Sequence, residues 1–468
     1  MQARKYMVLL VAMVLVLTGC EKWLDVKPKT QVDADLLYQR ESGYKDVLTG
    51  AYVNMSSTDM YGRELTFGFV DVVGNVYPNS SGNYNYIRNF DFTSIRQVEA
   101  KVAGMWSRTY NTLSNLNNLI ARLRTAGPDM FQADNYNVIL GESLGLRAYL
   151  HFDMLRLFAP SFKANAAASS IPYVSVYGYN PSAIGTVAAV LDSVLADLKA
   201  SAELLQLSDP IKTGRVITAS IDNGYLLNRN FHMNYFAVKA TMARVYLYKS
   251  DLVNAASCAD EVINSAKFSW IKQDAIANLN EAQRDRSFTP EQVLVLDVPK
   301  IADNLIDAES TLFFTSPYIN SLYSFANDWR KLYLWSPELG ASPNRYCIKL
   351  QQPENIPDNL GRRMPLIRLP ELYLISAEAA FDTDVEKARV RINDLRKNRG
   401  FDVLIPAGTT AATLRNELLL EYRREFIGEG VMFYYYKRLD ADKMEGGATT
   451  FTKQKYVIPI PVDETQFR

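Results

Sequence analysis

The sequence predicts a mainly α-helical protein with long loop-rich insertions that carry short strands. Three observations support this fold class. Apolar residues recur at helical spacing over several long segments, two segments have the small-residue pattern of helical hairpins, and only two stretches lose the helical period. The chain has 468 residues, of which 48% are apolar, so it can bury a large core. Because 51 basic residues balance 51 acidic ones, the net charge does not favour binding to nucleic acid.

The first 25 residues, MQARKYMVLLVAMVLVLTGCEKWLD, are typical of a bacterial export signal. A basic pair precedes an apolar run that is too short to span a bilayer as a helix. The run ends in Leu-Thr-Gly-Cys, which resembles the lipobox, after which the cysteine becomes the acylated first residue of the mature chain. We therefore expect residues 1–19 to be a signal peptide, Cys20 to carry lipid, and residues 20–36 to tether the folded domain to the membrane.

Three segments before residue 210 have apolar residues at helical spacing. The first, residues 44–55, follows Ser42, a residue type suited to cap a helix. The second, residues 102–123, predicts a long helix that stops at a Gly-Pro pair. The third, residues 187–198, lies directly behind Thr186, whose hydroxyl is a second candidate cap.

The stretch Gly141-Glu142-Ser143-Leu144-Gly145 matches the G-x-S-x-G motif of esterases. Apolar residues from 136 to 157 nevertheless keep one helical phase straight through Ser143, so the serine is predicted to lie inside a helix. Its two glycines then form a face that another helix can approach closely. The chain has only two histidines, His151 and His232, and the first is too near along the same helix to be the usual partner. The motif therefore favours packing over catalysis.

Two later segments match the spacing of tetratricopeptide hairpins, KATMARVYLYKSDLVNAASCADEVI and ELYLISAEAAFDTDVEKARVRINDLRKNRG. They lie much more than one repeat apart, so a regular solenoid is not expected. We expect a single domain over residues 37–468, with an N-terminal half over 37–230 and a C-terminal half over 231–468.

Two stretches lose the helical period, residues 71–95 and residues 268–370. The first is crowded with Asn, Tyr, Gly and Ser. The second contains short strand candidates at residues 293–298 and 346–350. Long structured loops on a rigid helical frame commonly carry function, so a ligand site is expected in these two stretches.

Motifs for most catalytic chemistry are absent from the sequence. There is no phosphate-binding loop, G-x-G-x-x-G, H-E-x-x-H or C-x-x-C, so no cofactor or metal site is predicted. Glu421 and Glu425 lie one helical turn apart and are a possible glycosidase pair. Arg423 and Arg424 flank them, however, and nearby positive charge keeps carboxylates ionised. A structural ion network is therefore the preferred interpretation, and no catalytic residue is predicted.

The chain as a whole resembles a known family, the SusD/RagB-like nutrient-binding outer-membrane lipoproteins of the Bacteroidetes. The blocks that carry the resemblance, besides Cys20, are WSRTYNTLSNLNNLI (106–120), ESLGLRAYLHFDMLRLFAP (142–160), KATMARVYLYKSDLVNAASCADEVI, PLIRLPELYLISAEAA (365–380), INDLRKNRG (392–400), EYRREFIGEG (421–430) and YVIPIP (456–461). One departure follows Glu429-Gly430, where an Arg and then an Asp are common but this chain has Met432 and Tyr435. That difference puts a local ion-pair network in doubt.

The resemblance implies a helical fold with tetratricopeptide-like hairpins, no catalysis, and exposure on the surface of a Gram-negative outer membrane. It also implies a role in capturing glycans or peptides for a SusC-like TonB-dependent transporter. The main expectation is therefore a glycan-binding lipoprotein. A peptide-binding member of the family and a surface glycosidase or esterase are the alternatives.

A glycan site needs flat aromatic rings for stacking and polar groups for hydrogen bonds, and both irregular stretches supply them. The predicted platforms are Tyr77, Tyr84 and Tyr86 in the first stretch and Tyr323, Trp329 and Trp335 in the second. The predicted hydrogen-bonding groups are Asp71, Asn75 and Asn83 in the first stretch and Asp328 and Arg330 in the second. Trp329, in a polar setting, is the strongest of these candidates.

Overall fold

The computed structural model describes residues 34–468 except 179, 310, 339–343, 353–359, 447–450 and 467–468. The predicted signal peptide, Cys20 and the tether up to residue 33 lie outside the described residues. Most of the described chain is helical, which confirms the predicted fold class. In this part of the chain, no helix combines the length and the apolar character that crossing a membrane requires.

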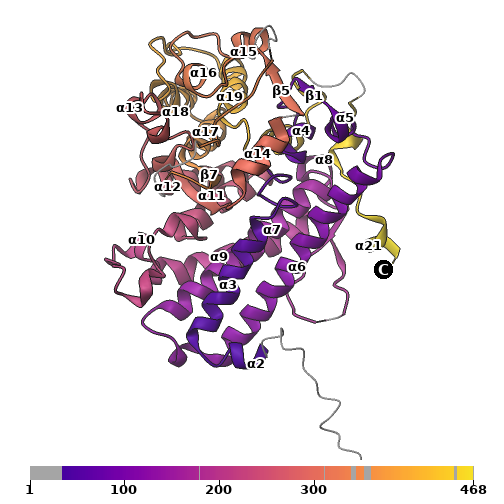
Figure 1. Ribbon diagram of the computed structural model, residues 1–468, viewed down its shortest axis with the longest axis vertical. Coiled ribbons are helices and arrows are strands. Elements are labelled where there is room, and N and C mark those ends of the chain that lie inside the picture. Colours follow the sequence, from indigo (N-terminus) through magenta and orange to yellow (C-terminus); the bar gives the residue numbers. More distant parts are fainter. Residues whose placement is uncertain are drawn as a thin grey trace, which may run out of the picture.

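An N-terminal helical layer forms the lower part of the molecule in Figure 1. It consists of α2 (Ala34–Leu37), α3 (Glu41–Met55), α6 (Arg96–Ala126), α7 (Asn135–Phe158) and α9 (Val187–Ser208). Helix α7 is central, because α6 and α9 both pack along it and nearly all of its side chains are buried. Two predicted boundaries are confirmed: α6 ends before Gly127, which has a φ of 70°, and the Thr186 hydroxyl caps α9 by accepting from the Ala189 N–H at 3.2 Å.

The predicted start of α3 is wrong. The helix begins at Glu41, so Ser42 lies inside its first turn, and the N-cap is Arg40, which makes no side-chain capping bond. A tertiary contact accounts for the earlier start. The Glu41 carboxylate accepts from the Gln132 N–H at 2.8 Å and from the side chain of Asn135, so the turn before α7 holds this end of α3.

Ser143 lies within α7, as predicted, and its environment is that of a packing residue. Its hydroxyl is buried and donates to the Ile139 carbonyl at 2.7 Å, one turn earlier in the same helix. A Cβ on Gly141 would lie 2.7 Å from Leu205 Cγ, and one on Gly145 would lie 2.6 Å from Met233 Cγ. The two glycines therefore let α9 and the start of the C-terminal half approach α7 closely.

Replacing Gly145 by valine is expected to lower the free energy of unfolding by about 1–3 kcal/mol, because the added methyl groups overlap Met233. Gly50→Ala is the matched control. Gly50 also lies inside a helix, but a Cβ there meets nothing within 4 Å, so alanine should raise stability by up to about 1 kcal/mol. Urea unfolding measures both variants. Equal effects at the two positions would contradict the packing role.

The C-terminal half contains both predicted hairpins. Helices α11 (Tyr235–Tyr248) and α12 (Leu252–Asn264) form the first, and α17 (Leu369–Ala380) and α18 (Val385–Lys397) form the second. Helix α12 also packs against α17, so the two hairpins are neighbours in space although they are far apart in the sequence. Two further helices, α19 (Ala411–Glu425) and α20 (Met432–Arg438), complete this half. Cys258, in α12, is a buried free thiol.

The two irregular stretches are more structured than predicted. The early one contains α4 (Phe69–Val73), β1 (Asn79–Ser80) and α5 (Gly82–Arg88). The later one contains α13 (Gln273–Ile276), β4 (Gln292–Asp297), α14 (Ile301–Glu309), β5 (Leu312–Thr315), α15 (Ser316–Leu322), α16 (Trp329–Tyr333), β6 (Asn344–Arg345) and β7 (Arg363–Arg368). The strand predicted at residues 293–298 is confirmed by β4. The strand predicted at 346–350 is wrong, because only Cys347 forms an isolated bridge there, to Trp335.

Three small antiparallel sheets are formed by the described residues. Strands β4 and β7 pair with each other, and Leu296 lies opposite Met364. Strand β4 contacts α11 of the first hairpin, and β7 contacts α17 of the second. Strands β2 (Ser169–Pro172) and β3 (Ile184–Thr186) form a hairpin beside α9. The third sheet has the order β1-β5-β6 and joins the two irregular stretches. Short helices α8 (Phe162–Asn165), α10 (Pro210–Thr213) and α21 (Val462–Gln466) occur in the connections and near the C-terminus.

Candidate functional site

The sheet β1-β5-β6 brings together the two stretches in which the sequence predicts a site. Asn79 of β1 pairs with Phe313 of β5, and Thr315 of β5 pairs with Asn344 of β6. The pairing is reinforced by the Ser81 N–H, which donates to the Thr311 carbonyl at 2.9 Å. Figure 1 shows β1, β5 and α5 side by side at the end of the molecule opposite α2. Residues more than 200 positions apart in sequence therefore share one surface.

Three of the predicted platforms lie on the inner side of this sheet and pack on one another. Phe314 is central to this cluster, because its ring centroid lies 5.4 Å from that of Tyr77 and 4.8 Å from that of Trp335. The Trp335 centroid lies 6.1 Å from the ring centroid of Tyr323. All four side chains are buried. The Tyr77 hydroxyl donates to the Phe67 carbonyl at 2.9 Å and the Tyr323 hydroxyl to the Arg424 carbonyl at 2.8 Å. Burial raises the pKa of both tyrosines well above the ordinary value. This corrects the prediction, because Tyr77, Tyr323 and Trp335 are core residues.

Three more predicted residues of the early stretch are used within the fold. The buried Asp71 carboxylate accepts from the N–H groups of Gly428 and Gly430, at 2.7 and 3.0 Å. The buried Tyr84 hydroxyl donates to the Glu64 carboxylate at 3.2 Å. The Asn75 amide donates to the Glu445 carbonyl. Burial corrects the prediction for Asp71 and Tyr84, while the half-buried Asn75 also connects the early stretch to another segment of the protein.

Two predicted residues of α5 remain accessible. Asn83 is exposed, and 39% of Tyr86 is exposed, on the helix that directly follows β1. The outer face of β5 adds a residue that was not predicted from the sequence. Burial alternates along this strand, so Leu312 and Phe314 point inward while Phe313 and Thr315 are half-buried on the other face. The alternation of the strand in the segment Leu-Phe-Phe-Thr was the signal that could have identified Phe313.

Trp329, the strongest candidate, is half-buried and packs on a turn of the second hairpin. The indole lies against Gly400, since a Cβ added to that glycine would lie 2.3 Å from Trp329 Nε1. The backbone N–H of Trp329 donates to the Arg399 carbonyl at 2.9 Å. Trp329 also packs against a small apolar cluster of Ile271, Ile276, Phe288 and Leu334. The indole is therefore held mainly as a packing group, although part of it stays accessible.

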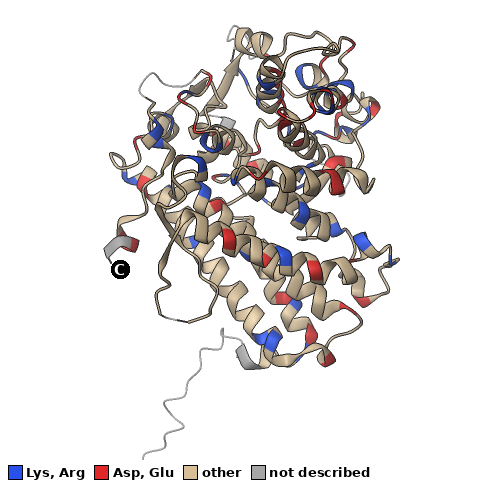
Figure 2. Cartoon of the chain, turned by 180° about the vertical axis from the view of Figure 1, so that it is seen from behind, with Lys and Arg blue, Asp and Glu red and all other residues tan. Residues whose placement is uncertain are grey.

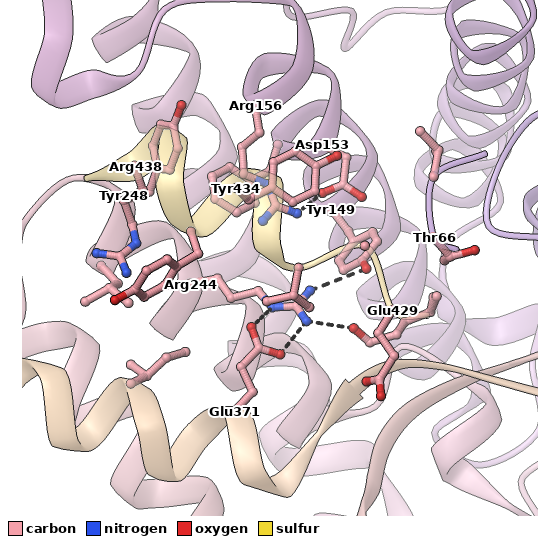
Figure 3. Close-up of a pocket in the computed structure, with 18 of the residues that line it drawn as sticks. Thr66, Tyr149, Asp153, Arg156, Arg244, Tyr248, Glu371, Glu429, Tyr434 and Arg438 are labelled. Atoms are coloured by element: carbon pink, nitrogen blue, oxygen red, sulfur yellow. Dashed lines mark hydrogen bonds and ion pairs between the residues drawn. The ribbon is translucent and has the colours of Figure 1, made fainter. Parts of the chain in front are cut away.

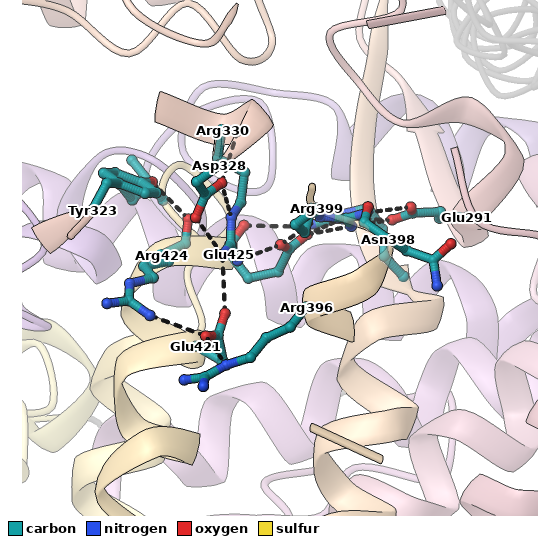
Figure 4. A network of polar contacts seen from close by, with 12 residues as sticks. Glu291, Tyr323, Asp328, Arg330, Arg396, Asn398, Arg399, Glu421, Arg424 and Glu425 are labelled. Carbon is teal, nitrogen blue, oxygen red and sulfur yellow. Dashed lines mark hydrogen bonds and ion pairs between the residues drawn. The ribbon is translucent and has the colours of Figure 1, made fainter. Parts of the chain in front are cut away.

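Asp328 and Arg330, the polar residues beside Trp329, belong to a buried charge network (Figure 4). Asp328 caps α16 and accepts from Arg330 Nε at 2.9 Å and from Nη2 at 2.8 Å. The Arg330 guanidinium also donates to Glu421 and Glu425, each at 3.0 Å. Both side chains are almost fully buried, so neither is accessible to a ligand. This corrects the prediction for Asp328 and Arg330.

The pair Glu421 and Glu425 lies inside the same network, as the sequence indicated. Glu425 accepts from Arg399 at 2.8 and 2.9 Å and from Arg368 at 2.7 Å. Glu421 accepts from Arg396 at 2.9 Å. Burial opposes ionisation of both carboxyls, but the arginines prevail and lower the pKa of each, most strongly that of Glu425. A glycosidase acid needs a raised pKa and access to substrate, and this pair has neither.

The other candidates for catalysis are also occupied by structural contacts. Glu142, next to Ser143, accepts from Arg229 at 2.6 Å and from the Tyr52 hydroxyl at 2.8 Å, and its carboxylate lies 3.1 Å from His232 Nδ1. His151 accepts from the Val174 N–H through Nε2 at 2.9 Å. Burial lowers the pKa of His151 to about 3. Among the described residues, the hydrogen bonds of His151 and His232 do not include Ser143, so the geometry does not form a serine–histidine pair.

A polar cavity of about 50 Å³ lies between α7, α11, α17 and α20 (Figure 3). Arg244 binds Glu371 across it with two contacts of 2.6 Å, and Arg156 pairs with Asp153. The hydroxyls of Tyr248 and Tyr434 have no hydrogen-bond partner among the described residues. This volume admits a few water molecules at most, so the cavity is too small for a sugar ring.

The described residues contain no group of three or more His, Cys, Asp or Glu side chains that could hold a metal ion. Figure 2 shows that basic and acidic residues are interspersed along the helices instead of gathering on one face. Within the two stretches in which the sequence predicts a site, the outer face of the β1-β5-β6 sheet with the neighbouring α5 carries the accessible Phe313, Tyr86 and Asn83 and is therefore the candidate binding surface.

Comparison with known families agrees with this architecture. A family model described as starch-binding and associating with the outer membrane matches residues 22–247. A second model, that of the SusD family, matches residues 343–467. Together the two matches cover well over half of the chain. The chain belongs to the SusD family. Members of this family are associated with the outer membrane. No curated protein sequence matches the chain.

Solved structures of SusD proteins share the whole fold. A SusD superfamily protein from Bacteroides thetaiotaomicron is 19% identical, with a TM-score of 0.73, over 91% of this chain and 98% of its own. A putative sugar-binding protein from Bacteroides vulgatus is 23% identical, with a TM-score of 0.71, over 91% and 96% of the two chains. A SusD-like carbohydrate-binding protein from Bacteroides vulgatus is 18% identical, with a TM-score of 0.67, over 86% and 84%. These identities establish the fold and leave the ligand open.

The departure from the common SusD sequence after Glu429-Gly430 is accommodated by apolar packing. Met432 and Tyr435 are buried, and the Tyr435 ring lies 4.6 Å from that of Tyr422. An ion-pair network nevertheless exists beside them, because Glu429 accepts from Arg368 at 2.6 Å and pairs with Lys349. An ion-pair network is therefore present despite the two substitutions, because Arg368 in β7 and Lys349 after β6 supply its positive charges.

Proposed function

We propose that this SusD protein is a cell-surface lipoprotein, anchored through Cys20, that captures a glycan for import by a SusC-like TonB-dependent transporter. The observation that carries the proposal is the β1-β5-β6 sheet, which unites the two irregular stretches and leaves Phe313, Tyr86 and Asn83 accessible at one end of the molecule. Aromatic rings stack on the C–H faces of sugars, and amide groups bind hydroxyls. Two of the structural relatives are described as sugar- or carbohydrate-binding, which supports the same ligand class.

Replacing Phe313 or Tyr86 by alanine is expected to weaken glycan binding about threefold to tenfold, because each ring supplies about 0.5–1.5 kcal/mol of contact. A glycan array identifies the oligosaccharide that binds, and calorimetry with that sugar compares the variants. Tyr177→Ala is the matched control, since Tyr177 is exposed on the loop between β2 and β3, outside the proposed face. Thermal unfolding should be nearly unchanged in all three variants.

The same measurements separate the alternatives. Retention of peptides from a library, with no binding on the glycan array, would favour the peptide-binding alternative. Shortening of a bound oligosaccharide during incubation would favour a glycosidase. Unchanged sugar affinity in both Phe313→Ala and Tyr86→Ala would place the site elsewhere.

The proposed transporter partner has its own test. Extraction of the native protein in several mild detergents, followed by pull-down, should recover a large outer-membrane barrel together with this chain. Recovery of the free monomer under every condition would contradict the partnership without bearing on glycan binding.

A further inference from the structure

A groove of about 420 Å³ lies beside α10. One wall comes from α10 and the loop after it, up to residue 230, and the other from residues 267–268 and 289–292, which end at the start of β4. This volume is much larger than that of the polar cavity in Figure 3 and lies in the range of small-ligand sites. Figure 1 shows α10 at the edge of the molecule, away from β1, β5 and α5. We call this site the α10 groove.

Buried contacts hold the two walls of the α10 groove in place. Arg229, in the first wall, donates to Asp209 at 2.9 and 3.1 Å and to Glu142 at 2.6 Å. The buried Asn234 amide donates to the Arg229 carbonyl at 3.0 Å and to the Val293 carbonyl at 2.9 Å, so it connects the first wall to β4. The fold itself therefore sets the shape of the groove, and binding does not require the walls to be assembled.

The lining combines ring surfaces with amides that are not used within the fold. Phe268 is half-buried and Pro290 is exposed on the second wall. On the first wall, the side-chain amides of Asn228 and Asn230 reach the solvent and make no hydrogen bond to another described residue. Ring surfaces of this kind pack on the C–H faces of sugars, and amides bind sugar hydroxyls.

The charge of the lining is positive. Arg215, Arg229 and Lys267 line the α10 groove, whereas no Asp or Glu of the described chain does. Arg229 is neutralised by its buried partners, and Arg215 donates to Asp134 at 2.9 Å. Lys267 is exposed, and its ammonium group forms no ion pair with another described residue. An unpaired ammonium group in a groove without carboxylates favours a ligand that carries negative charge.

We propose that the α10 groove binds an acidic sugar, with the carboxylate at Lys267, hydroxyls at Asn228 and Asn230, and the apolar face of the ring on Phe268 and Pro290. This second site rests on the proposed function for its ligand class, a glycan, and it adds a preference for sugars that carry a carboxylate.

A sugar is preferred over a peptide as the occupant of this groove. Peptides are commonly bound along a free strand edge or, as helices, in an apolar groove. Of the described strand residues, only Gln292 lines the α10 groove, and its side chain is already bonded to the Ser287 carbonyl at 2.9 Å and to Arg363 at 2.7 Å. The accessible polar groups are instead separate side-chain amides, which suit separate hydroxyls.

The test is calorimetry on the full-length protein in detergent. The probes are the disaccharides of galacturonate, glucuronate and mannuronate, each compared with its methyl ester, which keeps the ring and removes the charge. At least one acid should bind, and its ester should bind about twofold to fivefold more weakly. Lys267→Gln should weaken binding of the acid by the same factor and leave the ester unaffected. Asn230→Ala should weaken both about twofold to tenfold.

Lys272→Gln is the matched control. Lys272 is an exposed lysine of the same segment, but it does not line the groove, so its replacement should change neither affinity. Thermal unfolding should be nearly unchanged in all three variants, because each replaced side chain reaches the solvent.

Failure of this second site can be told apart from failure of the proposed function. Binding of none of the three acids, with a neutral glycan still bound at the β1-β5-β6 face, would overturn the α10 groove alone. Acid binding that is lost in Phe313→Ala but unchanged in Lys267→Gln and Asn230→Ala would overturn it by assigning the acid to that face. Binding of acidic peptides that depends on Lys267, without binding of any acidic sugar, would overturn it by assigning the groove to a peptide.

Discussion

Glu425→Ala is expected to destabilise the protein by about 3–5 kcal/mol. The side chain neutralises Arg330, Arg368 and Arg399, and all of these groups are almost fully buried. Removing the carboxylate leaves three guanidinium groups with fewer partners in a region without solvent, and an uncompensated buried charge is costly. Urea unfolding at pH 7 measures the loss.

Glu386→Ala is the matched control for this experiment. Glu386 is also a helical glutamate paired with an arginine, Arg389, but it is exposed, so its removal should have little effect on the free energy of unfolding. The expected difference between the two variants comes from burial. A similar small loss in both variants would show that the network contributes little to the stability of the fold.

Acidification is expected to remove about 3 kcal/mol of stability through Glu142. Burial opposes ionisation of this carboxyl, but Arg229 and His232 prevail and lower its pKa from 4.5 to about 2. A carboxyl whose pKa is lower in the folded state stabilises the fold above its unfolded pKa. The contribution is therefore complete above about pH 5 and is lost progressively as the pH falls from 4.5 toward 2.

Comparison with Glu142→Gln isolates this contribution from those of other carboxyls. Glutamine keeps the shape and can accept from Tyr52, but it cannot be ionised, so the variant should be less stable than the parent at pH 7. The difference between parent and variant in urea unfolding should shrink between about pH 5 and pH 3. A difference that stays constant over this range would contradict the lowered pKa of Glu142.

Much of the helical framework could be predicted from the sequence because a helix is a local structure. The apolar period located α6, α7 and α9 and placed Ser143 inside α7 despite the esterase-like motif, and the tetratricopeptide spacing located both hairpins. The start of α3 was missed because a distant contact, from Glu41 to the turn before α7, decides where that helix begins. A helix end that is fixed by a tertiary contact cannot be predicted from the local spacing of apolar residues.

The candidate binding residues were harder to predict, since residue type says little about which side of a strand is exposed. Tyr77 and Trp335 have the chemistry of sugar platforms, yet both pack on Phe314 beneath the sheet. Asp71 has the chemistry of a hydrogen-bonding ligand group, yet it binds the N–H groups of Gly428 and Gly430. The composition of the loops therefore pointed to a region of the surface, while most of the named side chains are used within the fold.

By itself the sequence determined the helical class, the balance of charge and the absence of familiar catalytic motifs, because each of these depends on composition or on short-range spacing. The alternation in Leu312–Thr315 separates the two phenylalanines onto opposite faces, but only the tertiary structure decided which face is outward. Phe313 is half-buried on the outer face, since Leu312 and Phe314 on either side of it are buried, and β5 is paired with β1 from more than 200 residues away. The pairing of β1 with β5 depends on the packing of the whole domain, so no local pattern in the sequence predicts it.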